Sequence, residues 1–133
     1  MEMVLLAGQA AALWCGLHLL LLLTLSALVV RQRRRHRVAV GDDGVPELLR
    51  AQRAFGNASE YAPAGMVALG VLAIAGAQPG MIHVIGATLL LGRVVHAIGM
   101  SLTAGVSIGR TVGMLLTWIA WVAAAVSLVI FAL

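Results

Sequence analysis

Four long apolar stretches constrain the fold of this chain more than any other feature. They cover about residues 3–30, 58–77, 81–102 and 111–133. Each is close to the roughly 20 residues that an α-helix needs to cross about 30 Å of hydrocarbon. Because unpaired backbone groups are costly in lipid, stretches of this length are expected to be helical. The sequence therefore predicts an all-α membrane protein, built as a four-transmembrane-helix bundle.

The remaining residues are too few for a separate soluble domain. The chain has 133 residues and is 62% hydrophobic, whereas soluble domains are about 45–50% apolar. A single membrane domain over residues 1–133 is expected, with its core between the helices. The first stretch does not resemble a signal peptide, because its apolar run is too long and arginines follow it in place of a small-residue cleavage site.

Arginines predict the orientation in the membrane. They follow the first stretch and precede the second, at Arg31, Arg33, Arg34, Arg35, Arg37, Arg50 and Arg53. The positive-inside rule places the connection of about residues 31–46 in the cytoplasm. The uncharged turn near Gly76 then lies on the opposite side, and both termini face away from the cytoplasm. The arginines after the first stretch could also contact anionic lipid, whereas a nucleic-acid partner is not expected.

The composition also favours a source and a location. The chain is rich in alanine, arginine and glycine and contains no lysine. This usage is typical of a GC-rich bacterial genome, which would place the protein in the inner membrane. An endoplasmic reticulum location would give the same topology relative to the cytoplasm.

A polar stripe lies where the second apolar stretch begins. Arg53, Asn57 and Glu60 stand at i, i+4 and i+7, so a helix projects them from one face. A helix from about Pro46 to Gly76 would be longer than the bilayer is thick, so its first turns are expected at the headgroups. A cation, an amide and an anion at the edge of lipid are costly unless they are used. The stripe therefore predicts a binding site.

Arg93 and His96 form a second polar feature inside the third stretch. At i and i+3 they face the same way. An arginine within the membrane usually has a carboxylate partner or faces a wet cavity. Glu60 is the one acidic residue within a predicted span, so it is expected to approach Arg93 or Arg53. The alternative is that Glu60 and Arg93 form a neutralising pair that only holds two helices together.

The remaining candidate features are less specific. Cys15 lies among leucines and is expected to be a small buried residue. No cluster of histidine and cysteine suggests a metal, so no metal site is expected. Gly105, Gly109 and Gly113 are four residues apart, a spacing that permits close approach of two membrane helices.

Two motifs within the four predicted spans resemble the MAPEG family, the membrane-associated proteins in eicosanoid and glutathione metabolism. The first reads Arg53-x-x-x-Asn57-x-x-Glu60-Tyr61-x-Pro63, and the second reads Gly92-Arg93-x-x-His96-x-x-Gly99. The likeness extends from the first span to the last. It implies left-handed four-helix protomers that assemble as a homotrimer, with glutathione held between neighbouring subunits near the cytoplasmic face.

The resemblance also implies a set of glutathione-binding residues: Arg50, Arg53, Asn57, Glu60, Tyr61, Arg93 and His96. Glutathione has two carboxylates, one amine, two amides and a thiol, so arginines, an acid and an amide are complementary to it. In this assignment the first two arginines bind carboxylates, Asn57 binds the peptide and Glu60 binds the amine. Tyr61 contacts either the ligand or a neighbouring helix.

Catalysis requires a group that lowers the pKa of the glutathione thiol, because the thiolate is the nucleophile. Eukaryotic enzymes of the family place tyrosines along the third span, where this chain has His96 and Met100. Arg110 and Ser107 are the candidates for thiol activation, and Ser101 and Thr103 are weaker ones.

The resemblance leads to an expected function with one main alternative. The expected function is a glutathione transferase that conjugates glutathione, its co-substrate, to apolar electrophiles and also reduces lipid hydroperoxides. The alternative is a non-catalytic lipid-binding or scaffold protein of the same fold. A small drug exporter is disfavoured, because the first span carries no acid for proton coupling.

Overall fold

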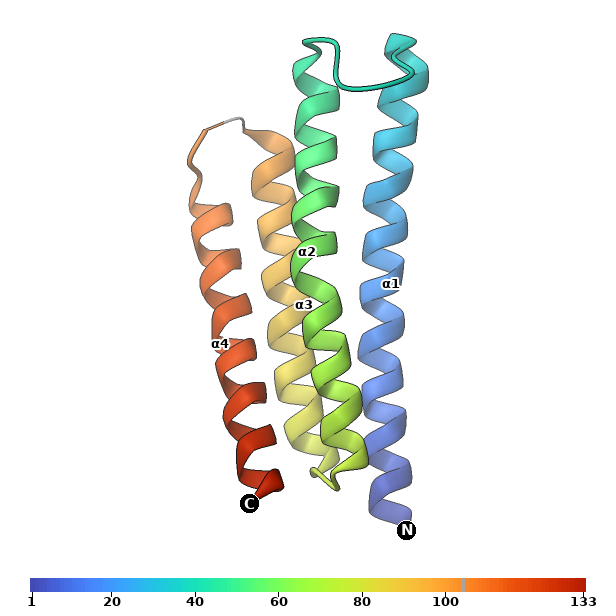
Figure 1. Cartoon of the computed structure of the whole chain (residues 1–133). Helices are drawn as coiled ribbons and strands as arrows, with labels where there is room; N and C mark the ends of the chain where they lie inside the picture. The colour runs from blue at the N-terminus through green and yellow to red at the C-terminus, as the bar shows by residue number, and fades with distance from the viewer. Residues whose placement is uncertain (104) are drawn as a thin grey trace.

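The computed structural model describes residues 1–103 and 105–133, and these form one bundle of four helices (Figure 1). The helices are α1 (Glu2–His36), α2 (Pro46–Ile74), α3 (Pro79–Leu102) and α4 (Ile108–Ala132). Neighbours in the sequence run in opposite directions, so both termini lie at the same end of the bundle. The prediction of an all-α chain with four helices is confirmed.

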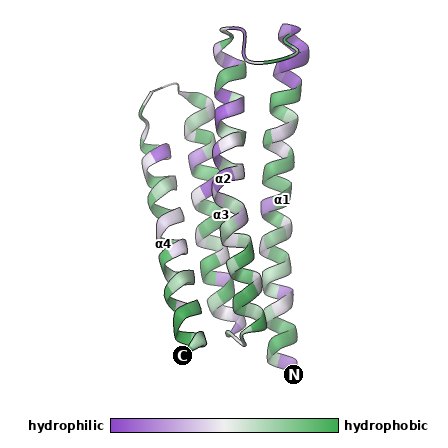
Figure 2. Ribbon diagram, viewed as in Figure 1, coloured by the Kyte–Doolittle hydropathy of each residue, from purple (hydrophilic) through white to green (hydrophobic). Residues whose placement is uncertain are grey.

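Three of the helices, α1, α3 and α4, are long and apolar enough to cross a membrane. Many of their apolar side chains face outward, as expected for contact with lipid; examples are Leu19, Leu23, Leu91, Ile119 and Val122. The chain is an integral membrane protein. Helix α2 does not reach the same apolarity, because polar residues fill its first half (Figure 2). Membrane crossing by α2 therefore stays a prediction.

The connection between α1 and α2 is shorter than expected. The sequence predicts a connection at about 31–46, but α1 continues through the arginines to His36, so the connection covers 37–45. Arginine is a good helix former, and positive charge near a helix C-terminus is favourable. Arg33 also holds the following turn, donating hydrogen bonds to the carbonyls of Ala39 at 3.2 Å and Gly41 at 3.1 Å. We call this end of the bundle the basic end.

Helix α2 follows the predicted course closely. It begins with Pro46 at its first position and Glu47 in its first turn, where the helix dipole favours an acid. It continues through Pro63 and ends at Ile74, near the predicted Gly76. Gly76 has a φ of 87°, a left-handed conformation that favours glycine and turns the chain into α3.

Helices α2 and α3 each contact the other three helices, and α3 packs most extensively against α4. Its approach to α4 is especially close. A Cβ atom on Gly113 would lie 2.5 Å from the backbone nitrogen of His96, and one on Gly109 would lie 3.3 Å from Gly99 Cα. A Cβ on Gly105 would meet nothing within 4 Å. The prediction of close helix approach is therefore confirmed at Gly109 and Gly113 and wrong at Gly105.

Candidate functional site

Arg93 lies in the interior of the bundle, where only 1% of its surface is exposed. Its Nε donates a hydrogen bond to Thr117 Oγ1 on α4 at 2.8 Å, and its Nη1 donates to Asn57 Oδ1 on α2, also at 2.8 Å. Its Nη2 reaches the Gly113 carbonyl at 3.3 Å and Met114 Sδ at 3.4 Å. The guanidinium thus joins three helices through uncharged partners.

An aromatic stack completes this arrangement. The Cζ of Arg93 lies 5.1 Å from the centre of the Tyr61 ring, within the range of a cation–π interaction. The Tyr61 ring also stacks on the ring of Trp121 from α4. The two ring centres are 5.3 Å apart and the interplanar angle is 27°. We refer to Arg93, Asn57, Tyr61, Thr117 and Trp121 as the Arg93 cluster.

The predicted ion pair of Glu60 with Arg93 or Arg53 is wrong for this chain. Glu60 is exposed, and in the described part of the chain the one ion pair is between Arg50 and Glu47, at 3.5 Å. The alternative of a neutralising Glu60–Arg93 pair fails for the same reason. Helix geometry explains the result, because successive residues turn by roughly 100°. On α2, Arg53 and Glu60 lie to one side of Asn57, whereas Tyr61 lies to the other and faces Arg93.

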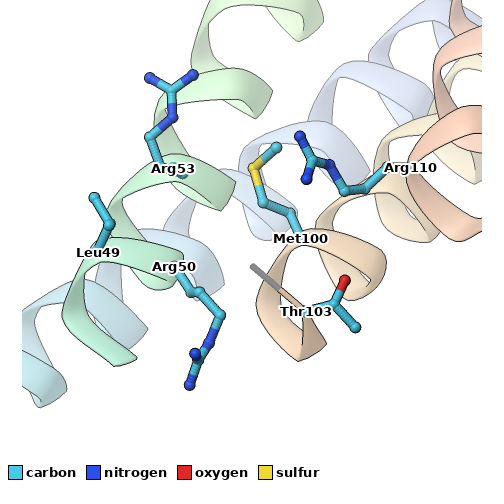
Figure 3. A pocket seen from close by; sticks show the side chains of 6 residues that line it. All are labelled: Leu49, Arg50, Arg53, Met100, Thr103 and Arg110. Carbon is cyan, nitrogen blue, oxygen red and sulfur yellow. The ribbon is translucent and has the colours of Figure 1, made fainter. Parts of the chain in front are cut away.

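A pocket of about 130 Å³ lies between α2, α3 and α4 at the basic end (Figure 3). Its lining residues are Leu49, Arg50, Arg53, Met100, Thr103 and Arg110. Three of them are arginines and none is acidic. Arg50 is paired with Glu47 at 3.5 Å, so Arg53 and Arg110 supply most of the positive field that suits an anion. Figure 3 shows Met100 of α3, and Thr103 just after its end, between the arginines of α2 and Arg110 of α4. We call this the arginine pocket.

Arg110 and Ser107, the two candidates for thiol activation, have different positions. Arg110 lines the arginine pocket, and its Nη1 donates a hydrogen bond to the Gly105 carbonyl at 2.6 Å. Ser107 is the N-cap of α4: its Oγ accepts from the Arg110 backbone N–H at 3.3 Å and donates to the Gly99 carbonyl at 3.5 Å. Ser107 does not line the arginine pocket, so its hydroxyl serves the helix end.

His96 is also separate from the arginine pocket. It is 6% exposed and borders a different pocket of about 330 Å³, which it shares with Met114, Trp118 and Arg110. Arg110 therefore lines both the arginine pocket and this second, more apolar pocket. Within one chain, neither His96 nor Arg93 lines the arginine pocket with the α2 arginines.

The structure divides the nine predicted site residues into groups. Arg50, Arg53 and Arg110 meet in the arginine pocket, whereas Asn57, Tyr61 and Arg93 meet in the Arg93 cluster. His96, Glu60 and Ser107 belong to neither. The sequence reasoning missed Thr117 and Trp121. Their i, i+4 spacing after Gly113 placed them on the α4 face that approaches Arg93, and this was the signal available.

Comparison with known proteins agrees with this architecture. A sequence model of the MAPEG family matches residues 11–130, a range that includes both the arginine pocket and the Arg93 cluster. The chain is also similar to two proteins named "Inner membrane protein YecN", from Escherichia coli K12 and from an O6:H1 strain. Each is 43% identical over 91 residues, which cover 68% of this chain and 70% of the relative. The extent of the family match shows that the chain belongs to the MAPEG family.

Proposed function

We propose that this protein is a membrane glutathione transferase that conjugates glutathione to apolar electrophiles. The observation that carries the proposal is the arginine pocket, whose lining contains Arg50, Arg53 and Arg110 and no acidic residue. Glutathione brings two carboxylates, and guanidinium groups bind carboxylates with charge-assisted, often bidentate hydrogen bonds. MAPEG membership supports the same ligand.

A single chain encloses only part of such a ligand. The arginine pocket measures about 130 Å³, whereas pockets for drug-sized ligands are about 300–1,000 Å³. We propose that a neighbouring subunit in a homotrimer supplies the remaining wall. The outward positions of Arg53 and Glu60 support this, because charges exposed beside lipid are costly unless another surface covers them. Glu60 would then bind the ligand amine across the subunit boundary.

Arg110 is the residue proposed to activate sulfur. Its charge, together with the N-terminus of α4, would stabilise a thiolate in the arginine pocket. The thiolate would attack an electrophilic carbon to form a thioether, and the leaving group would depart with the bonding electrons. The neighbouring pocket that contains His96 and Trp118 shares Arg110 and offers a more apolar lining for the electrophile. With a lipid hydroperoxide, the same thiolate would attack the terminal oxygen, the O–O bond would break, and the protonated alcohol would leave. A second glutathione would then convert the resulting sulfenic acid into glutathione disulfide and water.

The contacts of the activating residues support one alternative, a lipid-binding or scaffold protein without turnover. Ser107 is engaged as a helix cap, and Arg110 already donates a hydrogen bond to the Gly105 carbonyl. This alternative predicts that glutathione either fails to bind or binds without forming a thiolate.

We also propose a bacterial inner-membrane location, with the basic end in the cytoplasm and both termini on the other side. The names of the two relatives support the location, and the arginines at the end of α1 support the orientation. The arginine pocket would then open toward cytoplasmic glutathione.

The decisive experiment measures thiolate absorbance and conjugation of a chlorodinitrobenzene electrophile on detergent-purified protein. We expect the wild type to form thiolate and conjugate, and Arg53→Ala to weaken glutathione binding by about tenfold or more, the loss typical of a charge-assisted hydrogen bond. Arg35→Ala is the matched control, because Arg35 is exposed on α1 and lines neither pocket. Glutathione that leaves the melting temperature unchanged and yields no conjugate would refute the proposal.

A further inference from the structure

A second pocket at the basic end lies on the opposite side of Arg50 from the arginine pocket. It measures about 200 Å³ and is enclosed by α1, α2 and α3. Its lining residues are Leu25, Leu28, Gln32, Glu47, Arg50, Ala51, Ala54 and Ser101. Unlike the arginine pocket, it combines a cation with an acid and with apolar side chains. We call it the mixed pocket.

The mixed pocket lies where the helices change from apolar to polar. On α1, Leu25 and Leu28 belong to the apolar run, whereas Gln32 belongs to the arginine-rich end. On α2, Ala54 lies on the apolar side of Arg50, toward the centre of the bundle. Figure 2 shows the ends of α1 and α2 becoming hydrophilic together. In a membrane, this level corresponds to the boundary between hydrocarbon and headgroups.

The polar groups of the mixed pocket have two kinds of chemistry. Arg50 supplies a half-buried cation that can donate to a phosphate. Glu47 supplies a carboxylate, and Gln32 supplies an amide oxygen that is buried without a hydrogen-bond partner in the described chain. Buried polar atoms normally have a hydrogen-bond partner, so a ligand with an N–H or O–H donor would satisfy this oxygen. A ligand that complements the whole set carries both an anion and an N–H cation.

We propose that the mixed pocket binds a phospholipid whose headgroup carries a primary ammonium beside its phosphate. The phosphate accepts hydrogen bonds from Arg50, and the ammonium donates to Glu47 and to the Gln32 amide oxygen. The acyl chains continue along Leu25 and Leu28, which lead from the pocket into the apolar part of α1. Glu47 and Gln32, which select the ammonium, do not line the arginine pocket, whereas Arg50 lines both pockets.

Native mass spectrometry of the detergent-purified full chain tests the proposal with three lipids of matched acyl chains. Phosphatidylethanolamine carries the primary ammonium, phosphatidylcholine has no N–H on its cation, and phosphatidylglycerol has no cation. We expect the first lipid to be retained about tenfold better than the other two, as for one charge-assisted hydrogen bond. Equal retention of all three, or preference for phosphatidylglycerol, would overturn the proposal; the latter would indicate charge attraction by the α1 arginines.

Two variants locate the binding site. Glu47→Gln keeps the shape of the side chain but removes its charge, and we expect it to abolish the preference for phosphatidylethanolamine over phosphatidylcholine. Glu60→Gln, the same substitution deeper on α2, should retain the preference because Glu60 lines no part of the mixed pocket. If Glu47→Gln still prefers phosphatidylethanolamine over phosphatidylcholine, the mixed pocket is not the lipid-binding site. Displacement of the lipid by soluble phosphoethanolamine at equal concentration would show that the pocket selects a free zwitterion instead.

Discussion

Arg93 on α3 donates a hydrogen bond from Nη1 to Asn57 Oδ1 on α2 at 2.8 Å, and this bond connects the centre of the bundle to the polar stripe. Asn57 is therefore a structural partner of a buried cation. The bond also accounts for the absence of a carboxylate partner, because the other donors of Arg93 reach Thr117, Gly113 and Met114. This bond uses the Oδ1 of Asn57, so contact with glutathione would fall to its side-chain NH2 group, which can still donate.

Asn57→Leu should destabilise the protein. The substitution removes the acceptor and leaves a buried N–H of Arg93 without a partner, which costs about 1–3 kcal/mol. Thermal unfolding in detergent measures the effect. Ser59→Ala on the same helix is the control, since Ser59 donates only to the carbonyl of Phe55 one turn earlier. If the two variants unfold at the same temperature, the Arg93–Asn57 bond contributes no stability.

The role of Tyr61 can be separated into its ring and its hydroxyl. The ring lies between Arg93 and Trp121, so Tyr61→Phe should preserve the stack and the melting temperature. Tyr61→Leu should lose the cation–π and stacking contributions, about 0.5–2 kcal/mol together. Glutathione affinity is measured on both variants. A loss of affinity in Tyr61→Phe at unchanged stability would show instead that the hydroxyl contacts the ligand.

The close approach of α3 and α4 predicts a strong difference between two glycines. A Cβ on Gly113 would lie 2.5 Å from the His96 backbone nitrogen, and backbone atoms there cannot move without separating the helices. Gly113→Ala should therefore destabilise the protein by about 1–3 kcal/mol. Gly70→Ala in α2 meets nothing within 4 Å and should be neutral or stabilising, because alanine favours a helix interior by about 0.8–1.0 kcal/mol. Similar melting temperatures for the two variants would contradict the observed packing.

The sequence predicts the helices well because long apolar runs and their flanking signals are local. Pro46 and Glu47 mark the start of α2 without any reference to the rest of the fold. The partners of Arg93 were not predictable in this way. The charge rule proposes Glu60 as the partner, but the direction of each α2 side chain depends on where α3 and α4 pack. Arg93 contacts the aromatic ring of Tyr61 and not the carboxylate of Glu60, although the two residues are adjacent on α2.

The arginine pocket was predicted only in part, because its α2 residues are close in the sequence whereas its α4 residue is brought to them by packing. Arg53 was identified from the polar stripe and Arg50 from the family resemblance, and both line a pocket with Arg110. Ser107 was grouped with Arg110 by proximity in the sequence, but it lies on the side of the α4 N-terminus that faces Gly99. Serine before a helix is a common N-cap, so the cap itself is a local signal, whereas the bond to Gly99 depends on how α3 and α4 pack.

Ser107 and Arg110 should differ in their effects on the proposed thiolate. Ser107→Ala removes the N-cap of α4, which costs about 1 kcal/mol of stability, but it should leave thiolate absorbance intact. Arg110→Gln keeps a hydrogen-bonding side chain and removes the charge in the arginine pocket, so glutathione should bind with strongly reduced thiolate formation. Absorbance titration and binding calorimetry on both variants separate these effects. Full thiolate in Arg110→Gln and none in Ser107→Ala would transfer the activating role to the hydroxyl, which would then have to leave its cap.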